Sequence, residues 1–142
     1  MKISLYSKLA RRHVVVARRI IANTGAPDNA NGIRKFRRDI FCLQHAELSA
    51  LKTINDMYSM STCRDLLFHT RESHFSIEDI KAYLNELGLI FIGFEGIAAA
   101  KQNYKRMFPD DPGMINLDNW SVFESRYPDT FISMYDINAQ KL

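Results

Sequence analysis

The sequence predicts an α/β protein with a partial sheet of about three strands and a large helical insertion. Strand-like apolar patterns occur at three places, residues 1–7, 89–94 and 130–139. Helical periodicity fills most of the remaining chain, and a helix directly precedes the second strand, as in α/β sheets. Three strands are few for 142 residues, so we expect an incomplete sheet.

Composition indicates one globular domain spanning residues 1–142. The hydrophobic fraction is 46% and the charged fraction 25%, which are ordinary values for a folded domain. No apolar run approaches the roughly 18 residues of a membrane span. Cys42 and Cys63 are too few for a disulfide scaffold, and both lie in apolar helical contexts. We therefore expect a cytoplasmic protein.

Charge is distributed unevenly along the chain. Residues 1–38 carry a net charge of +9 and residues 39–142 a net charge of −6. Such a split can mark an arm that faces RNA or DNA. Charge runs are more often solvated helix faces, with arginine stems covering apolar surface. Nucleic acid is therefore not the expected partner.

The first elements follow from alternation and then from helical spacing. Met1–Ser7 alternates, with Ile3 and Leu5 on one face, which predicts a strand. Ser7 is expected to cap a helix that runs to about Ile21. Three more helices are predicted over residues 32–45, over residues 46–57 and from about residue 61. Thr62 and Asp65 match the spacing of a capping box at the start of the last one.

A second capping box, Ser76 with Asp79, predicts the start of a helix over Ile77–Leu87. Gly88 lies where a left-handed residue usually ends a helix. Leu89–Phe94 is almost entirely apolar, which predicts a strand covered on both faces.

The last third of the chain predicts two helices and a strand. The first helix spans residues 97–107, and the second extends through Arg126 and buries Trp120 and Phe123. Thr130–Ala139 is predicted to be the final strand.

Metal and nucleophile chemistry are both weakly indicated. Cys63, His69 and His74 lack the spacing of known zinc sites. A nucleophile pair would join Cys63 to His69 or to His13, and Cys63 and His69 would point about 120° apart on a helix. A buried cysteine that acts as a small hydrophobic side chain is the simpler interpretation.

Arg64, Asp65 and Glu72 form the more informative polar cluster. They lie near the aromatic residues Tyr58 and Phe68 in the sequence. A guanidinium and carboxylates in such a setting can bind a polar substrate group. The alternative is an internal ion pair that fixes the start of a helix. The sequence leaves both open.

Several longer motifs occur together in this chain. They are MKISLYS at 1–7, KLARRHVVVARRII at 8–21, the segment Ser61–Glu72, the GFE step Gly93–Glu95, the turn Phe108–Asp111, the helix with Trp120, Phe123 and Glu124, and the segment Pro128–Tyr135. In this combination they resemble the C-terminal half of bacterial class I S-adenosylmethionine-dependent methyltransferases, in particular the group often fused to tetratricopeptide repeats.

This resemblance implies part of a Rossmann-like sheet. Residues 1–7, 89–94 and 131–139 would supply its fifth, sixth and seventh strands, and the helices within 27–75 would be an insertion over the substrate side. Asp136, Ile137 and Asn138 depart from the aromatic residues expected there. The Gly-rich turn that binds the cofactor in such enzymes is absent, so no cofactor-binding residue is expected.

The resemblance implies the C-terminal, substrate-side portion of a methyltransferase that is inactive alone. S-adenosylmethionine would bind only to the complete enzyme. The expected substrate contacts are Arg64, Asp65, His69 and Glu72. Unpaired sheet edges favour self-association or a partner protein.

Two alternatives belong to other classes of protein. One is a non-enzymatic helical interaction or regulatory module. The other, weaker alternative is a nucleic-acid-binding domain that uses Arg11, Arg12, Arg18, Arg19, Arg34, Arg37 and Arg38.

Overall fold

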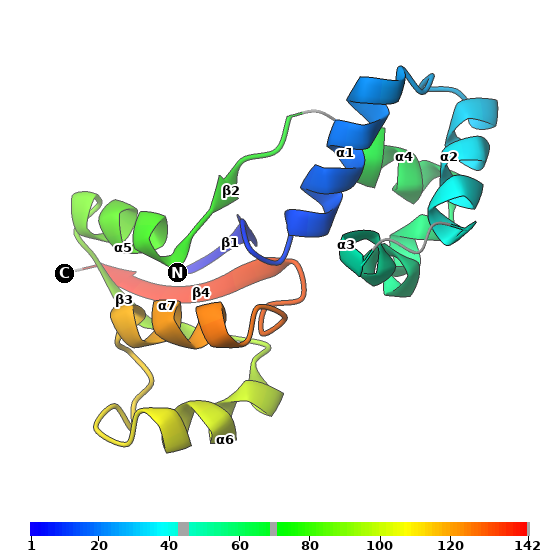
Figure 1. Cartoon of the computed structure of the whole chain (residues 1–142). Coiled ribbons are helices and arrows are strands. Elements are labelled where there is room, and N and C mark those ends of the chain that lie inside the picture. The colour runs from blue at the N-terminus through cyan, green and yellow to red at the C-terminus, as the bar shows by residue number, and fades with distance from the viewer. Residues whose placement is uncertain (43–45, 69–70, 142) are drawn as a thin grey trace. The chain divides into compact units, whose positions relative to one another are not determined.

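The computed structural model describes residues 1–42, 46–68 and 71–141, and it is α/β as predicted. It divides into two compact units (Figure 1). The sheet unit comprises residues 1–10 and 73–142, and the helical unit is Arg11–Glu72. The helical unit is thus inserted in the chain between two parts of the sheet unit. We expected its bounds at 27–75, but it begins earlier, with the first helix, and ends before a short strand.

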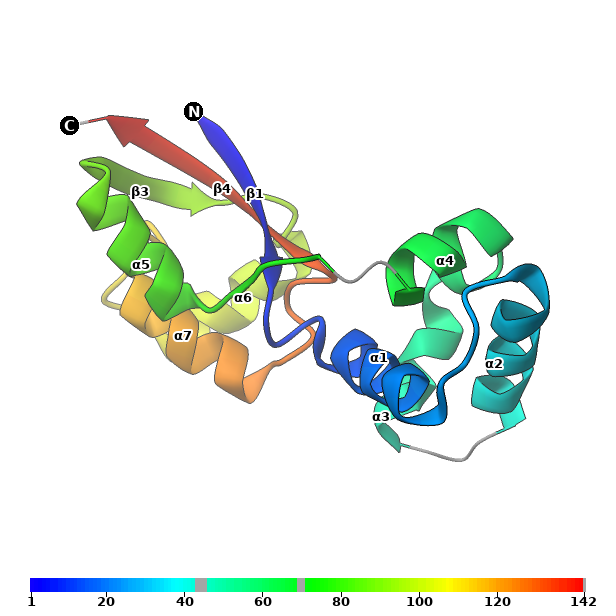
Figure 2. The ribbon, with the colours of Figure 1, turned by 90° about the horizontal axis from the view of Figure 1, so that it is seen from above.

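The sheet unit contains a mixed sheet of four strands in the described residues. They are β1 (Lys2–Ser7), β2 (His74–Phe75), β3 (Leu89–Phe94) and β4 (Met134–Lys141). The strand order is β2-β1-β4-β3, and Figure 2 shows β4 between β1 and β3. β4 is antiparallel to both neighbours, whereas β1 and β2 are parallel. Strands occur at all three predicted places, but the last one begins at Met134 and not at Thr130. β2 was missed because two residues are too few to show a period.

The core of the sheet unit lies between one face of the sheet and three helices. These are α5 (Ile77–Glu86), α6 (Ala98–Met107) and α7 (Leu117–Arg126). Trp120 of α7 stacks on Tyr104 of α6 with ring centroids 4.0 Å apart, and both side chains are fully buried. In the sheet, Ile137 of β4 lies opposite Ile3 and is fully buried. Aromatic packing therefore supplies much of this core.

β3 is not covered on both faces, so that prediction is wrong. Phe91 and Phe94 are buried, but Ile90 and Ile92 are 46% and 47% exposed. The continuous apolar run predicted two covered faces. In the sheet unit, helices pack against only one face, so the alternate side chains of the strand remain exposed.

The helical unit has its own core. Its helices are α1 (Arg12–Thr24), α2 (Ala30–Cys42), α3 (Ala46–Ser49) and α4 (Met60–Phe68), with 3₁₀ turns at Ala50–Thr53 and Asn55–Met57. Val14, Ile40 and Leu48 are among the fully buried residues. The predicted second helix ends at Cys42 within the described chain, and its residues 43–45 lie outside the described residues.

The single helix predicted over residues 46–57 is wrong. Ile54 is extended, at φ −84° and ψ 122°, and separates the two 3₁₀ turns. Leu48 and Leu51 are both buried, and a spacing of three suits a 3₁₀ turn as well as an α-helix. Asn55 and Asp56 favour turns over helix interiors, which explains the interruption.

The capping signals gave mixed outcomes. The box at the start of α5 is confirmed, since the Asp79 N–H donates to Ser76 Oγ at 3.2 Å and the Ser76 N–H donates to Asp79 Oδ2 at 2.8 Å. The box expected at Thr62 is wrong, because Thr62 lies inside α4 and its hydroxyl donates to the Asp56 carbonyl at 2.9 Å. Gly88 is left-handed as predicted, with φ of 62°.

Ser7 caps a turn, whereas the predicted helix was expected to begin directly after it. Its Oγ accepts from the Ala10 N–H at 3.0 Å, and α1 begins only at Arg12. Across the described residues, every helix is too short or too polar to cross a lipid bilayer.

Candidate functional site

The predicted site residue Arg64 lies on α4 and pairs with Asp28, in the loop before α2. Arg64 Nε donates to Asp28 Oδ1 at 2.7 Å and Arg64 Nη2 donates to Oδ2 at 3.1 Å. The side chains are 57% and 49% exposed. The hydrogen bond to Asp28 raises the pKa of Arg64. This two-point pair joins α4 to the loop, and its exposure gives it little weight in stability.

Glu72, by contrast, lies in a buried cluster with two arginines of the helical unit. Its side chain is 7% exposed, and it pairs with Arg11 and, at 2.7 Å, with Arg18 Nη1. Arg18 also donates to the Leu66 carbonyl from Nε at 3.1 Å and from Nη2 at 2.8 Å. Glu72, the last residue of the helical unit, is therefore held to the start and middle of α1 by its two arginines. Arg18 in turn connects α1 to α4.

The other two predicted site residues are Asp65 and His69. Asp65 is exposed on α4. His69 lies outside the described residues. Arg64 and Glu72 have different partners, so the described structure does not bring these two predicted side chains together. Their contact with a substrate stays a prediction. Among the described residues, three or more potential metal-ligating side chains do not gather anywhere.

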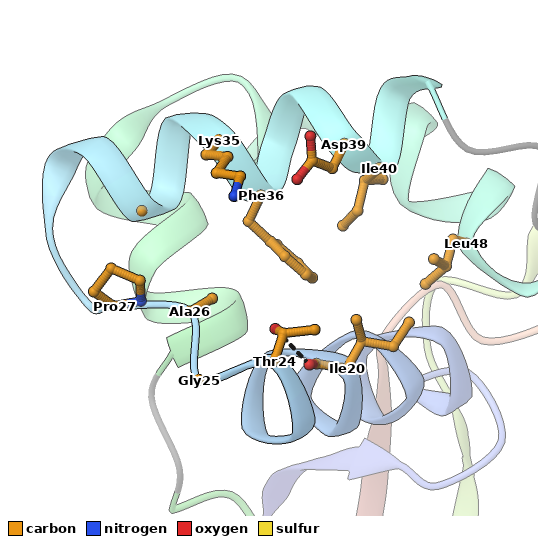
Figure 3. Close-up of a pocket in the computed structure, with 11 residues that line it drawn as sticks. Ile20, Thr24, Gly25, Ala26, Pro27, Lys35, Phe36, Asp39, Ile40 and Leu48 are labelled. Atoms are coloured by element: carbon orange, nitrogen blue, oxygen red, sulfur yellow. Dashed lines mark hydrogen bonds between the residues drawn. The ribbon is translucent and has the colours of Figure 1, made fainter.

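Sequence analysis missed a hollow of about 310 Å³ in the helical unit, between the end of α1 and α2. Figure 3 shows Phe36, Ile40, Leu48 and other residues around it, with Thr24 bonded to the Ile20 carbonyl at 2.8 Å. Lys35 also lines it. Asp39 lines it too, so the hollow combines a basic and an acidic side chain with apolar ones such as Phe36 and Ile40. Its lining residues come from α1, the loop after it, α2 and α3, which only the tertiary structure brings together.

A second missed feature is a buried polar cluster at the end of β1. Ser7 donates from Oγ to Glu124 Oε1 at 2.9 Å, and the Tyr135 hydroxyl lies 2.8 Å from both carboxylate oxygens. Glu124 is only 5% exposed. The cluster joins β1, β4 and α7 through one carboxylate. A glutamate among the apolar residues of α7 was the sequence signal that could have revealed it.

Burial controls the protonation of this cluster. It raises the pKa of Glu124, and the hydrogen bonds from Tyr135 and Ser7 oppose that effect. Burial also raises the pKa of Tyr135, so its phenol stays protonated and donates. With so little exposure, these groups hold the carboxyl end of β1 in place and are not accessible to a substrate. Ligands of open α/β sheets bind outside such carboxyl ends.

The sheet unit also has an apolar groove of about 380 Å³ beside β1. Ile3 and Leu5 of β1 form one wall, and Phe75 of β2 contributes. Tyr83 of α5 and Leu87, which follows α5 directly, form the other wall. Tyr83 and Leu87 are 51% and 64% exposed. Apolar surface is therefore left open next to the strand.

These features define an α/β protein with a four-stranded mixed sheet and an inserted helical unit. A scan against models of protein families and a search of the curated proteins found no match to the chain.

Proposed function

We propose that this chain is the C-terminal, substrate-side portion of a class I S-adenosylmethionine-dependent methyltransferase whose cofactor-binding half is supplied by other residues. One observation carries the proposal: β4, the last strand, lies antiparallel between β1 and β3. The class I sheet ends in the same way, with its seventh strand between the fifth and the sixth. This is an analogy of fold.

The open edge of β1 gives independent support. β1 pairs with β2 only at Tyr6 and Ser7, so Lys2–Leu5 have no strand on that side within the described chain. The apolar groove lies beside this same strand. An unpaired edge next to uncovered apolar surface is expected where a sheet continues into residues outside the unit.

The residues present do not fit the cofactor. Class I enzymes bind it with a Gly-rich turn that follows an early strand. Here Lys8 and Leu9 follow β1 directly, and Ser76 begins the capping box of α5 directly after β2. No such turn exists at either strand, so no chemical step through the cofactor is assigned to this chain.

Calorimetry tests the proposal. The chain alone should give no binding heat with S-adenosylmethionine or its demethylated product. The residues encoded directly upstream should contain a Gly-rich methyltransferase half, and a polypeptide with both halves should bind the cofactor. Micromolar binding by the chain alone would contradict a missing cofactor half. An upstream sequence without such a half would remove the basis for the assignment.

The open edge also predicts self-association of the isolated chain. Met1 bonds to Ala139 of β4 and Ser7 bonds to Ser133, directly before β4, so by strand alternation the backbone N–H of Ser4 faces the open edge. Ser4→Pro removes this donor without removing a bond to β4. Ser4→Ala is the matched control, because both variants lose the 2.5 Å bond to Asp136. Sedimentation velocity should show weaker association for Ser4→Pro only. Equal association in both variants would exclude this edge as the contact.

A second candidate function, a non-enzymatic helical interaction module, has one observation in its favour. The helical unit packs its own buried cluster, which includes Ile33, Ile40, Met57 and Cys63. A unit with its own core can present a surface without a catalytic partner. Affinity capture with the full chain as bait that recovers only the chain itself would count against this function.

A further inference from the structure

The structure separates the arginines that the sequence grouped together. Arg11 and Arg18 are held in the buried cluster with Glu72 and are not available to a ligand. Arg34, Arg37 and Arg38 instead lie together on α2 and line a hollow of about 310 Å³ with Phe41 and Met60. We call this the arginine hollow. Acidic side chains do not line it in the described part of the chain.

The charges of the arginine hollow are uncompensated. Arg37 is held by the Tyr58 carbonyl at 3.5 Å and by Met60 Sδ at 3.6 Å, neither of which carries a negative charge. Within the described chain, Arg34 and Arg38 have no ion-pair partner. Residues spaced by three and four are neighbours on a helix, so these three guanidinium groups repel one another. An anionic ligand would relieve that repulsion.

Phe41, the aromatic residue in the lining of the hollow, indicates which kind of ligand carries the anion. Phe41 packs against Tyr58 with ring centroids 5.7 Å apart. Tyr58 is 60% exposed and its hydroxyl donates to the Lys52 carbonyl at 2.7 Å, which fixes the ring. Aromatic side chains beside guanidinium groups suit a planar base joined to a phosphate.

We propose that the arginine hollow binds the phosphate of a nucleotide, with the base against Phe41. Arg34 and Arg38 contact the phosphate, and Arg37, anchored by Tyr58 and Met60, orients it. The nucleotide is either free or part of a single strand, because both present the same phosphate and base. This inference is independent of the methyltransferase proposal, since it uses only side chains of the helical unit.

The test compares four probes on the full chain at low salt: AMP, adenosine, inorganic phosphate and a short single-stranded RNA. AMP should bind at least about tenfold more tightly than adenosine, because adenosine lacks the charged acceptor. RNA that binds no more tightly than AMP indicates a free nucleotide, and tighter, salt-sensitive binding of RNA indicates a single strand. Adenosine binding as tightly as AMP, or no binding of any probe, would overturn the proposal.

Variants locate the site. Arg34→Gln/Arg38→Gln should weaken AMP binding about tenfold or more. The control Arg19→Gln/Lys101→Gln removes the same charge from exposed residues that do not line the hollow. It should change binding less than about twofold, since exposed charges outside the hollow are screened by solvent and salt. An equal loss in both double variants would attribute binding to net charge and refute the site. Circular dichroism checks folding, and Arg34→Gln alone serves if the double variant unfolds.

Discussion

Replacing Glu72 by Gln should destabilise the protein strongly, because the change leaves Arg11 and Arg18 without their shared carboxylate. The Glu72 side chain is 7% exposed and those of the arginines 10% and 18%. Breaking a buried ion pair by removing one partner costs about 3–5 kcal/mol, most of it from the uncompensated charge. With a urea dependence of about 2 kcal/mol per molar, the unfolding midpoint should fall by about 2 M.

The matched control is Asp28→Asn, which removes the carboxylate partner of Arg64. Both pairs are arginine–carboxylate contacts of the helical unit, and burial is the main difference, since Asp28 is 49% exposed. Urea unfolding followed by far-UV circular dichroism measures the two variants side by side. Asp28→Asn should leave the midpoint almost unchanged. Equal midpoint shifts in the two variants would refute the argument from burial.

Two further predictions concern the sheet unit, and fluorescence of Trp120, the single tryptophan, reports on both. Burial raises the pKa of Glu124 above its usual 4.5, so the folded state binds a proton at this carboxyl more tightly than the unfolded state does. The folded state gains stability from this proton below pH 4.5 and loses that gain as the pH rises through the raised pKa. The stability of wild type relative to Glu124→Gln should therefore fall with rising pH, and a constant difference would contradict this. Ser76→Ala should cost about 1 kcal/mol by removing the cap of α5. The control Ser125→Ala, on an exposed part of α7, should cost less than about 0.5 kcal/mol; equal losses would count against the cap.

Short-range patterns in the sequence predicted much of the fold. The alternation of Ile3 and Leu5 located β1, and the apolar run of residues 89–94 located β3. The pairing of Ser76 with Asp79 located the start of α5. Each of these signals depends on neighbours within a few residues, so the sequence contains the whole interaction.

The candidate site was much harder to predict, because it depends on contacts between distant residues. Arg64 was a reasonable candidate for substrate binding, yet its partner Asp28 lies 36 residues away. Glu72 contacts Arg11 across 61 residues. The arginine hollow was hidden in a basic run whose members look alike in sequence. Only packing separates the buried arginines from those that line the hollow.

By itself, the sequence determined where the three long strands occur, except for the start of β4, and it determined the cap of α5 and the left-handed turn at Gly88. Local geometry favours these features wherever the segment lies. The tertiary structure alone decided that β4 lies between β1 and β3, that Glu72 is buried with two arginines, and that Ile90 and Ile92 are exposed. The physical reason is that burial and strand pairing are properties of surfaces brought together in space. Side-chain periodicity specifies which face of an element is apolar, but not which partner covers it.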